Sequence, residues 1–232
     1  MRPVSYSMGM SADGYVVGPD GFDWAVPDDE VFQHHTDEIR EVGVHLLGRK
    51  LHHTMLYWET AEEDPELDDA NRTWARLWKA LPKVVLSSTL TEVEGTNTRL
   101  STVGLEAEIR QLHEEPGEGV IAIGGATLAA AAAGLGLIDE YRILIYPVLV
   151  GGGLPYFAHV LRRVELELLE TRTFASQVVY LRYRVVRKAP TDTPFSTRAS
   201  DLGAPDIDPV KALGIAAEME DDEIARKMRA GK

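Results

Sequence analysis

Apolar and polar residues alternate from Val4 to Met10, which is the pattern of a β-strand with one face against a core. Glycines, prolines and aspartates follow, so we expect a long loop after this strand. Apolar residues at helical spacing begin after Pro27, where the proline and the acidic residues beside it favour the first turn of a helix. This segment predicts a helix over residues 28–42.

The alternation of apolar strands with amphipathic helices continues along the chain. Residues 140–150 are almost continuously apolar, as expected for a strand between two layers of helices. The acid-rich segment 59–69 predicts a solvated loop. Further strands are expected at 44–47, 83–88, 119–125 and 140–150, and helices at 51–58, 70–81, 105–112 and 127–135. This order predicts an α/β fold with a doubly wound, mostly parallel sheet and helices on both faces.

The pattern changes after the glycines at 151–153. Alternating residues at 164–168 and 179–185 predict a C-terminal antiparallel hairpin at the edge of the sheet. From Arg187 onward the chain is rich in Pro, Thr, Ser, Asp and Ala, and only 209–228 could be a helix. We therefore expect a domain over residues 1–187 and a polar tail over 188–232 in which a terminal helix could form.

The composition narrows the classes of function. The 232 residues are 44% hydrophobic and 26% charged, which fits a globular protein. The chain has no cysteine, so disulfide scaffolds, thiol nucleophiles, iron–sulfur clusters and cysteine-bound zinc are excluded. A net charge of -13 disfavours nucleic acid and anionic membranes as partners. The N-terminus has no signal-like apolar stretch and no apolar run is long enough to span a bilayer, so a cytoplasmic location is expected.

Three of the expected strands end in residues suited to binding phosphate groups. In open α/β sheets, ligands bind at the carboxyl ends of the strands, where helix N-termini present free N–H groups. Arginine adds a planar fork that matches phosphate oxygens, hydroxyls add donors, and glycines allow a close approach. The segments are Gly48-Arg49-Lys50, Ser87-Ser88-Thr89 and Gly124-Gly125-Ala126-Thr127. Together they could hold a dinucleotide. The alternative is structural: paired glycines also occur in tight turns, and an arginine after a glycine also occurs at a solvated helix start.

The absence of other motifs excludes several kinds of site. The fingerprints of the usual nucleotide-binding loops, of esterases and of zinc proteases are absent from the sequence. The pairs His34-His35 and His52-His53 lack metal-ligand spacing, because adjacent residues of a helix point about 100° apart. We therefore expect no metal site. A dinucleotide-binding site, if present, would be of a kind that lacks the usual glycine-rich fingerprints.

The ordered motifs of the chain resemble the dihydrofolate reductase fold. They are the segments 11–18, 24–29, 47–55, 84–88 and 123–125. The segments 137–141 and 147–153 look more like the reductase domain of bacterial riboflavin biosynthesis, the RibD C-terminal domain. The resemblance covers residues 4–186, and the chain is similar to stand-alone proteins that combine the two sets of features.

This resemblance implies a dihydrofolate reductase-like fold and NADPH as the cofactor. Gly48, Arg49, Lys50 and the hydroxyls of 87–89 would hold its phosphates and adenosine ribose. The paired glycines, with the amides of Ala126 and Thr127, would hold its pyrophosphate. A small-molecule substrate is implied, and a homodimer could form through the sheet edge.

The resemblance also implies where the substrate would bind. The substrate acid of the family stands on the first helix, shortly after a tryptophan and a proline. Trp24 and Pro27 match these residues, which brings Asp29 into the acid's place, with its neighbours Asp28 and Glu30 as competitors. The implied substrate pocket is bounded by Met8, Trp24, Asp29 and the turn at Gly151.

The activity implied is hydride transfer from NADPH to a heterocyclic substrate, of the 5-amino-6-(5-phosphoribosylamino)uracil reductase type of riboflavin biosynthesis. Dihydrofolate, or another pterin or carbonyl compound, is the alternative, because the Arg-rich, His-containing first helix of riboflavin-pathway reductases is not matched here. A third interpretation is a non-catalytic NADPH-binding interaction module whose tail recruits a partner. In the catalytic case an acid must stand near the reduced bond, and Asp29 is the expected residue unless it serves only the helix dipole.

Overall fold

The computed structural model describes residues 1–157 and 163–187 of the chain. These residues belong to one compact unit, Met1–Arg187. The polar tail expected over 188–232, with its helix at 209–228, lies outside the described residues.

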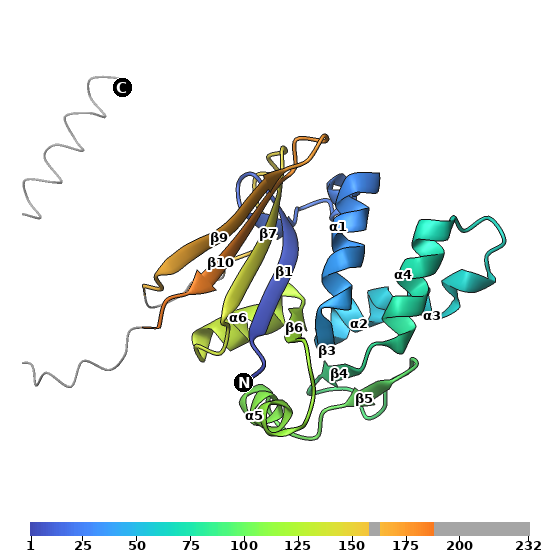
Figure 1. Cartoon of the computed structure of the whole chain (residues 1–232), viewed down its shortest axis with the longest axis vertical. Helices are drawn as coiled ribbons and strands as arrows, with labels where there is room; N and C mark the ends of the chain where they lie inside the picture. Colours follow the sequence, from blue (N-terminus) through green and yellow to red (C-terminus); the bar gives the residue numbers. More distant parts are fainter. Residues whose placement is uncertain (158–162, 188–232) are drawn as a thin grey trace, which may run out of the picture. The chain divides into compact units, whose positions relative to one another are not determined.

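An eight-stranded sheet forms the centre of this unit, in the order β5-β4-β3-β6-β1-β7-β10-β9 (Figure 1). The first six strands in this order run parallel to their neighbours, and β10 is antiparallel to both β7 and β9. The predicted α/β fold with a mostly parallel sheet and a C-terminal antiparallel hairpin is confirmed. The strands are β1 (Val4–Ser11), β3 (Val42–Gly48), β4 (Lys83–Leu86), β5 (Thr98–Leu100), β6 (Val120–Gly124), β7 (Glu140–Tyr146), β9 (Leu166–Thr173) and β10 (Val179–Val185).

Helices cover both faces of the sheet. On one face, α5 and α6 pack against buried residues of β1, β3 and β6, such as Tyr6 and Leu46. On the other face, α1 and α4 contribute Ile39 and Trp78 to a core that includes Leu47. None of the described helices is long and apolar enough to cross a membrane. The helices are α1 (Asp29–Arg40), α2 (Arg49–Met55), α3 (Tyr57–Thr60), α4 (Asp69–Ala80), α5 (Leu105–Glu114) and α6 (Ala126–Gly134), with short 3-10 turns at Asp23–Ala25 and Ala61–Glu63.

Several elements differ from the sequence-based expectations. β7 ends at Tyr146 rather than at residue 150, because Pro147 has no N–H to offer a neighbouring strand. The helix expected over 51–58 is divided into α2 and α3. The segment 59–69, expected to be a loop, contains the end of α3 and a 3-10 turn whose Ala61 is buried. The three-residue strand β5 was not expected.

The loop after β1 is hydrogen-bonded to the glycine-rich turn after β7. A two-stranded sheet joins β2 (Tyr15–Val17) to β8 (Leu154–Pro155). The Asp13 carboxylate accepts hydrogen bonds from the backbone N–H groups of Val150 at 3.2 Å and Gly151 at 2.7 Å. These contacts fix the position of the two loops that follow the central strands.

Candidate functional site

The three phosphate-binding segments predicted from the sequence lie next to one another at one edge of the sheet. β4, β3 and β6 are neighbours and run parallel, so their carboxyl ends share this edge. The register sets Gly48 beside Leu86, and Leu47 beside Gly124. The residues that follow each strand therefore begin at nearly the same level of the sheet.

Two helices begin at this edge, each directly after a glycine. Gly48 precedes α2 and Gly125 precedes α6, and no side chain caps the first turn of either helix. A Cβ atom added to Gly125 would lie 3.7 Å from the Cβ of Leu51 in α2, so the two helix starts are close neighbours. Each start presents free N–H groups and a partial positive charge. An anion with several oxygens, such as a pyrophosphate, suits this arrangement.

Two exposed basic side chains stand at the beginning of α2. Neither Arg49 nor Lys50 has a salt bridge or side-chain hydrogen bond to any residue that the structure describes. Arg99 and Arg182, by contrast, are held by buried or half-buried carboxylates. The Arg49 guanidinium therefore keeps all its donors available for a ligand.

The three hydroxyls after β4 differ in their hydrogen-bond partners. Ser87 Oγ accepts hydrogen bonds from the N–H groups of Thr89 at 3.1 Å and Leu90 at 3.2 Å, so it fixes the turn. The side chains of Ser88 and Thr89 are exposed, and the Thr89 hydroxyl lies 3.3 Å from Ser87 Oγ. Of the three, Ser88 therefore offers the hydroxyl that is free of partners in the described part of the chain, on the same edge as Arg49.

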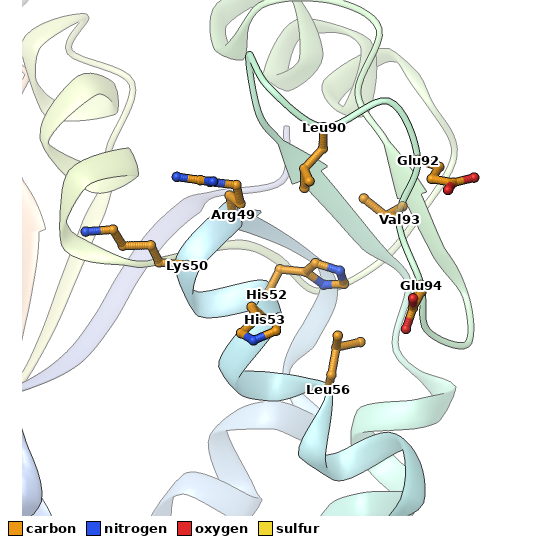
Figure 2. A pocket seen from close by; sticks show the side chains of 9 residues that line it. All are labelled: Arg49, Lys50, His52, His53, Leu56, Leu90, Glu92, Val93 and Glu94. Atoms are coloured by element: carbon orange, nitrogen blue, oxygen red, sulfur yellow. The ribbon is translucent and has the colours of Figure 1, made fainter.

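A cavity of about 530 Å³ opens between α2 and the loop that follows β4. In Figure 2, the Arg49 and Lys50 side chains extend from α2 away from the loop that carries Val93 and Glu94, whereas the His52 ring points toward this loop. The volume falls within the range of small-molecule sites. Its lining consists of Arg49, Lys50, His52, His53, Leu56, Leu90, Glu92, Val93 and Glu94.

The three acids at the start of α1 have different partners. Asp28 is the N-cap and accepts the backbone N–H three residues later at 2.8 Å. Glu30 accepts hydrogen bonds from the backbone N–H of Ala175 at 2.9 Å and from the Arg172 guanidinium, and both lower its pKa. Asp29 is exposed, and its carboxylate has no hydrogen bond to the described part of the chain. Of the three, only Asp29 is not engaged by the fold.

Trp24 and Tyr146 lie on the same face of the sheet as α1. Their rings meet edge to face at 5.8 Å, and the Trp24 indole donates to the carbonyl of Gly21 at 3.2 Å. The Tyr146 ring packs over Gly9, and a Cβ added to Gly9 would lie 2.9 Å from the ring. Burial and the nearby Asp28 carboxylate raise the pKa of Tyr146 to about 12. Tyr146 was not predicted as a site residue because it ends an apolar run, and only the Pro147 that follows could have marked it as a strand end.

Met8 and Gly151 do not join this group in the expected way. The Met8 side chain packs on the opposite face of the sheet, against the core that includes α5 and α6, whereas Trp24 packs with residues of α1 and β7. Successive side chains of a strand alternate between faces, so Gly9 rather than Met8 faces α1. Gly151 has a φ of +75° and is bound through its N–H to Asp13. The structure thus brings Trp24 and Asp29 to one end of the sheet and leaves Met8 apart.

Comparison with solved structures shows the same fold in other bacterial proteins. A putative riboflavin biosynthesis protein from Shewanella sp. PV-4 matches 81% of this chain and all of its own, with a TM-score of 0.64 and 23% identity. A pyrimidine reductase-like protein from Corynebacterium diphtheriae matches 81% of this chain and 93% of its own, with a TM-score of 0.59 and 14% identity. At these identities the likeness concerns the fold.

Sequence comparison identifies the family. The uncharacterized protein YyaP of Bacillus subtilis is 32% identical over 186 residues, which are 78% of this chain and 94% of that protein. A stretch of 42 residues is 45% identical to the putative antitoxin VapB37 of Mycobacterium tuberculosis and covers half of it. The family model of the RibD C-terminal domain matches residues 2–180. The chain therefore belongs to the RibD C-terminal domain family.

Proposed function

We propose that this protein is an NADPH-dependent reductase that delivers a hydride to a heterocyclic substrate, of the 5-amino-6-(5-phosphoribosylamino)uracil reductase type. The observation that carries the proposal is the pair of uncapped helix starts beside an unpaired arginine at one edge of the sheet. The names of the structural neighbours, a riboflavin biosynthesis protein and a pyrimidine reductase-like protein, support the same class of substrate.

The residues present fit a phosphorylated dinucleotide. The N–H groups at the starts of α2 and α6 would bind the pyrophosphate, since they have no side-chain caps. Arg49 and Lys50 would bind the additional 2′-phosphate, because their charges are not used by the fold. When bound, NADPH supplies the hydride for the substrate.

At the substrate end, the chain must supply a proton. Reduction of a C=N or C=O bond places the hydride on carbon, and a proton must then reach the nitrogen or oxygen. Asp29 is exposed and unpaired, so we assign it to orient the substrate's N–H groups and to relay the proton through water. Tyr146, whose raised pKa keeps its hydroxyl protonated at neutral pH, would donate a hydrogen bond beside it. The Trp24 ring, which meets Tyr146 edge to face, would give the substrate an apolar surface to pack against.

The cofactor assignment is tested by substituting Arg49. Arg49→Ala should weaken NADPH binding by about 1.5–3 kcal/mol, the contribution of a charged hydrogen bond, and should hardly change NADH binding. Fluorescence titration of the wild type and the variant with both cofactors measures this. If the wild type binds NADPH and NADH equally, the 2′-phosphate assignment is wrong.

The substrate assignment is tested by turnover. Oxidation of NADPH, followed at 340 nm, should be fast with the aminouracil ribose phosphate and slow with dihydrofolate or other pterins. A reversed order would assign the protein to pterin reduction instead.

The 42-residue likeness to a putative antitoxin favours a second candidate, a non-catalytic NADPH-binding module that acts through a protein partner. Such a module should bind NADPH in the same titration. It should oxidise it with neither class of substrate.

A further inference from the structure

The cavity beside α2 has two chemically different ends. Arg49 and Lys50 line one end, with their cationic side chains extending away from the loop after β4, and the His52 ring and Glu94 line the other end (Figure 2). The Val93 side chain lines the wall beside Glu94. A ligand with an anionic group at one end and a polar-edged group at the other would suit this lining.

His52 faces this cavity as a neutral ring. Its side chain is buried, and burial lowers its pKa, so the imidazole carries one N–H donor and one acceptor nitrogen at neutral pH. Neither nitrogen makes a hydrogen bond to the residues that the structure describes. The ring therefore has an unused donor beside the space that a ligand would fill.

Glu94 adds an acceptor to that donor. Both residues line the same cavity, and in Figure 2 the His52 ring points toward the loop that carries Glu94. The neighbouring Glu92 also belongs to the loop, but its carboxylate turns away from the cavity in Figure 2. An ionised carboxylate only accepts hydrogen bonds, so Glu94 selects for a ligand N–H group.

This donor and acceptor match the edge of adenine. Adenine presents its 6-amino group, a donor, next to a ring nitrogen that accepts. Hypoxanthine has a carbonyl oxygen in place of the amino group and an N–H in place of the adjacent N1 acceptor. The oxygen of hypoxanthine would face the Glu94 carboxylate, and two acceptors without a proton between them repel each other.

We propose that His52 and Glu94 read the adenine edge of the cofactor and make the protein select adenine over hypoxanthine dinucleotides. The inference rests on the proposed function, because it places the adenosine end of NADPH in this cavity. It adds a base-reading pair to the phosphate-binding residues, and it predicts selectivity at an end of the cofactor that takes no part in hydride transfer.

The test compares NADPH with its reduced hypoxanthine analogue, in which the 6-amino group is replaced by oxygen. The wild type should bind NADPH about tenfold more tightly than the analogue. Glu94→Gln should reduce this preference to about twofold or less, because an amide side chain can donate to the carbonyl as well as accept from the amine. His52→Phe, which keeps a flat ring but removes the N–H, should also reduce it.

Two further variants provide the controls. Glu92→Gln removes the same charge from the same loop and should keep the tenfold preference. Arg49→Ala should weaken both dinucleotides by the same factor, because the phosphates are identical. Melting temperatures show that each variant is folded.

The outcomes separate this inference from the proposed function. If both dinucleotides bind equally to the wild type, or if Glu92→Gln lowers the preference as much as Glu94→Gln does, the base-reading pair is wrong while NADPH binding stands. If neither dinucleotide binds to the wild type, the proposed function fails and the inference fails with it.

Discussion

His45 lies directly beneath the paired glycines of the candidate cofactor site. It belongs to β3, and its Cε1 atom would be 2.6 Å from a Cβ added to Gly124. Its ring also meets the Trp78 ring edge to face at 5.6 Å. Burial lowers the pKa of His45 to about 4. We therefore expect the folded protein to hold this imidazole neutral where an unfolded chain would protonate it.

The size of the effect follows from the two pKa values. An unfolded histidine titrates near pH 6.5, and the folded value is about 4. Between these values the unfolded chain binds more protons than the folded one, so the free energy of unfolding falls as the pH is lowered. Above pH 6.5 the ring is neutral in both states and has no effect, and as the pH falls from 6.5 toward 4 proton uptake by the unfolded chain increasingly favours unfolding. At pH 5 the loss is about 2 kcal/mol.

The assay is urea unfolding at pH 7.5 and at pH 5.0, for the wild type and for His45→Gln. The glutamine does not titrate, so the wild type should lose about 2 kcal/mol more than the variant between these two values. His53→Gln changes an exposed histidine on α2 and should keep the wild-type loss. Equal losses in the wild type and in His45→Gln would refute the assignment.

Three other substitutions or truncations test the site and the fold. Asp29→Asn should lower turnover by about 10² while leaving NADPH affinity and melting temperature nearly unchanged, and wild-type turnover from pH 5 to 8 would assign the role to a neighbouring acid. Lys83→Met should lower the free energy of unfolding in urea by about 2 kcal/mol, because the buried Nζ donates to the carbonyls of Trp78 and Leu81 at 2.7 and 3.0 Å. Truncation after Arg187 should change the melting temperature by no more than a few degrees, and a larger drop would show that the tail stabilises the domain.

Hydrophobic periodicity was sufficient to predict the strands that are buried. β6 is buried at every position and β7 at nearly every one, and each stood out as an apolar run between turns. β5 could not be found in this way, because it has three residues and is held by side chains from elsewhere. Its Arg99 pairs with the buried Glu108 of α5, which also accepts the Ser101 hydroxyl at 2.6 Å. Such a contact depends on tertiary structure that no local pattern contains.

The residues of the candidate site that follow strand ends could be predicted from the sequence. The face of the sheet on which a strand's side chain lies could not. Arg49 and the glycine segments follow three strands, and parallel pairing alone brings those ends together. Met8 was expected to face the substrate, but a shift of one residue along β1 turns a side chain to the opposite face. Gly9 occupies the facing position, and a glycine carries no side chain that could mark it as part of a pocket.

The two paired glycines are required by the fold for different reasons. Gly125 has a φ of +96°, a conformation that other residues rarely adopt. Gly124 has no such restriction, but an added Cβ would lie 2.6 Å from both His45 and Leu51, and Leu51 belongs to α2. Gly124 thus allows α2 to pack closely against the end of β6, which brings the two helix starts together. Because both glycines are needed before any ligand binds, their presence cannot by itself indicate a cofactor. The uncapped N–H groups and the unpaired charge of Arg49 are the features that favour a cofactor.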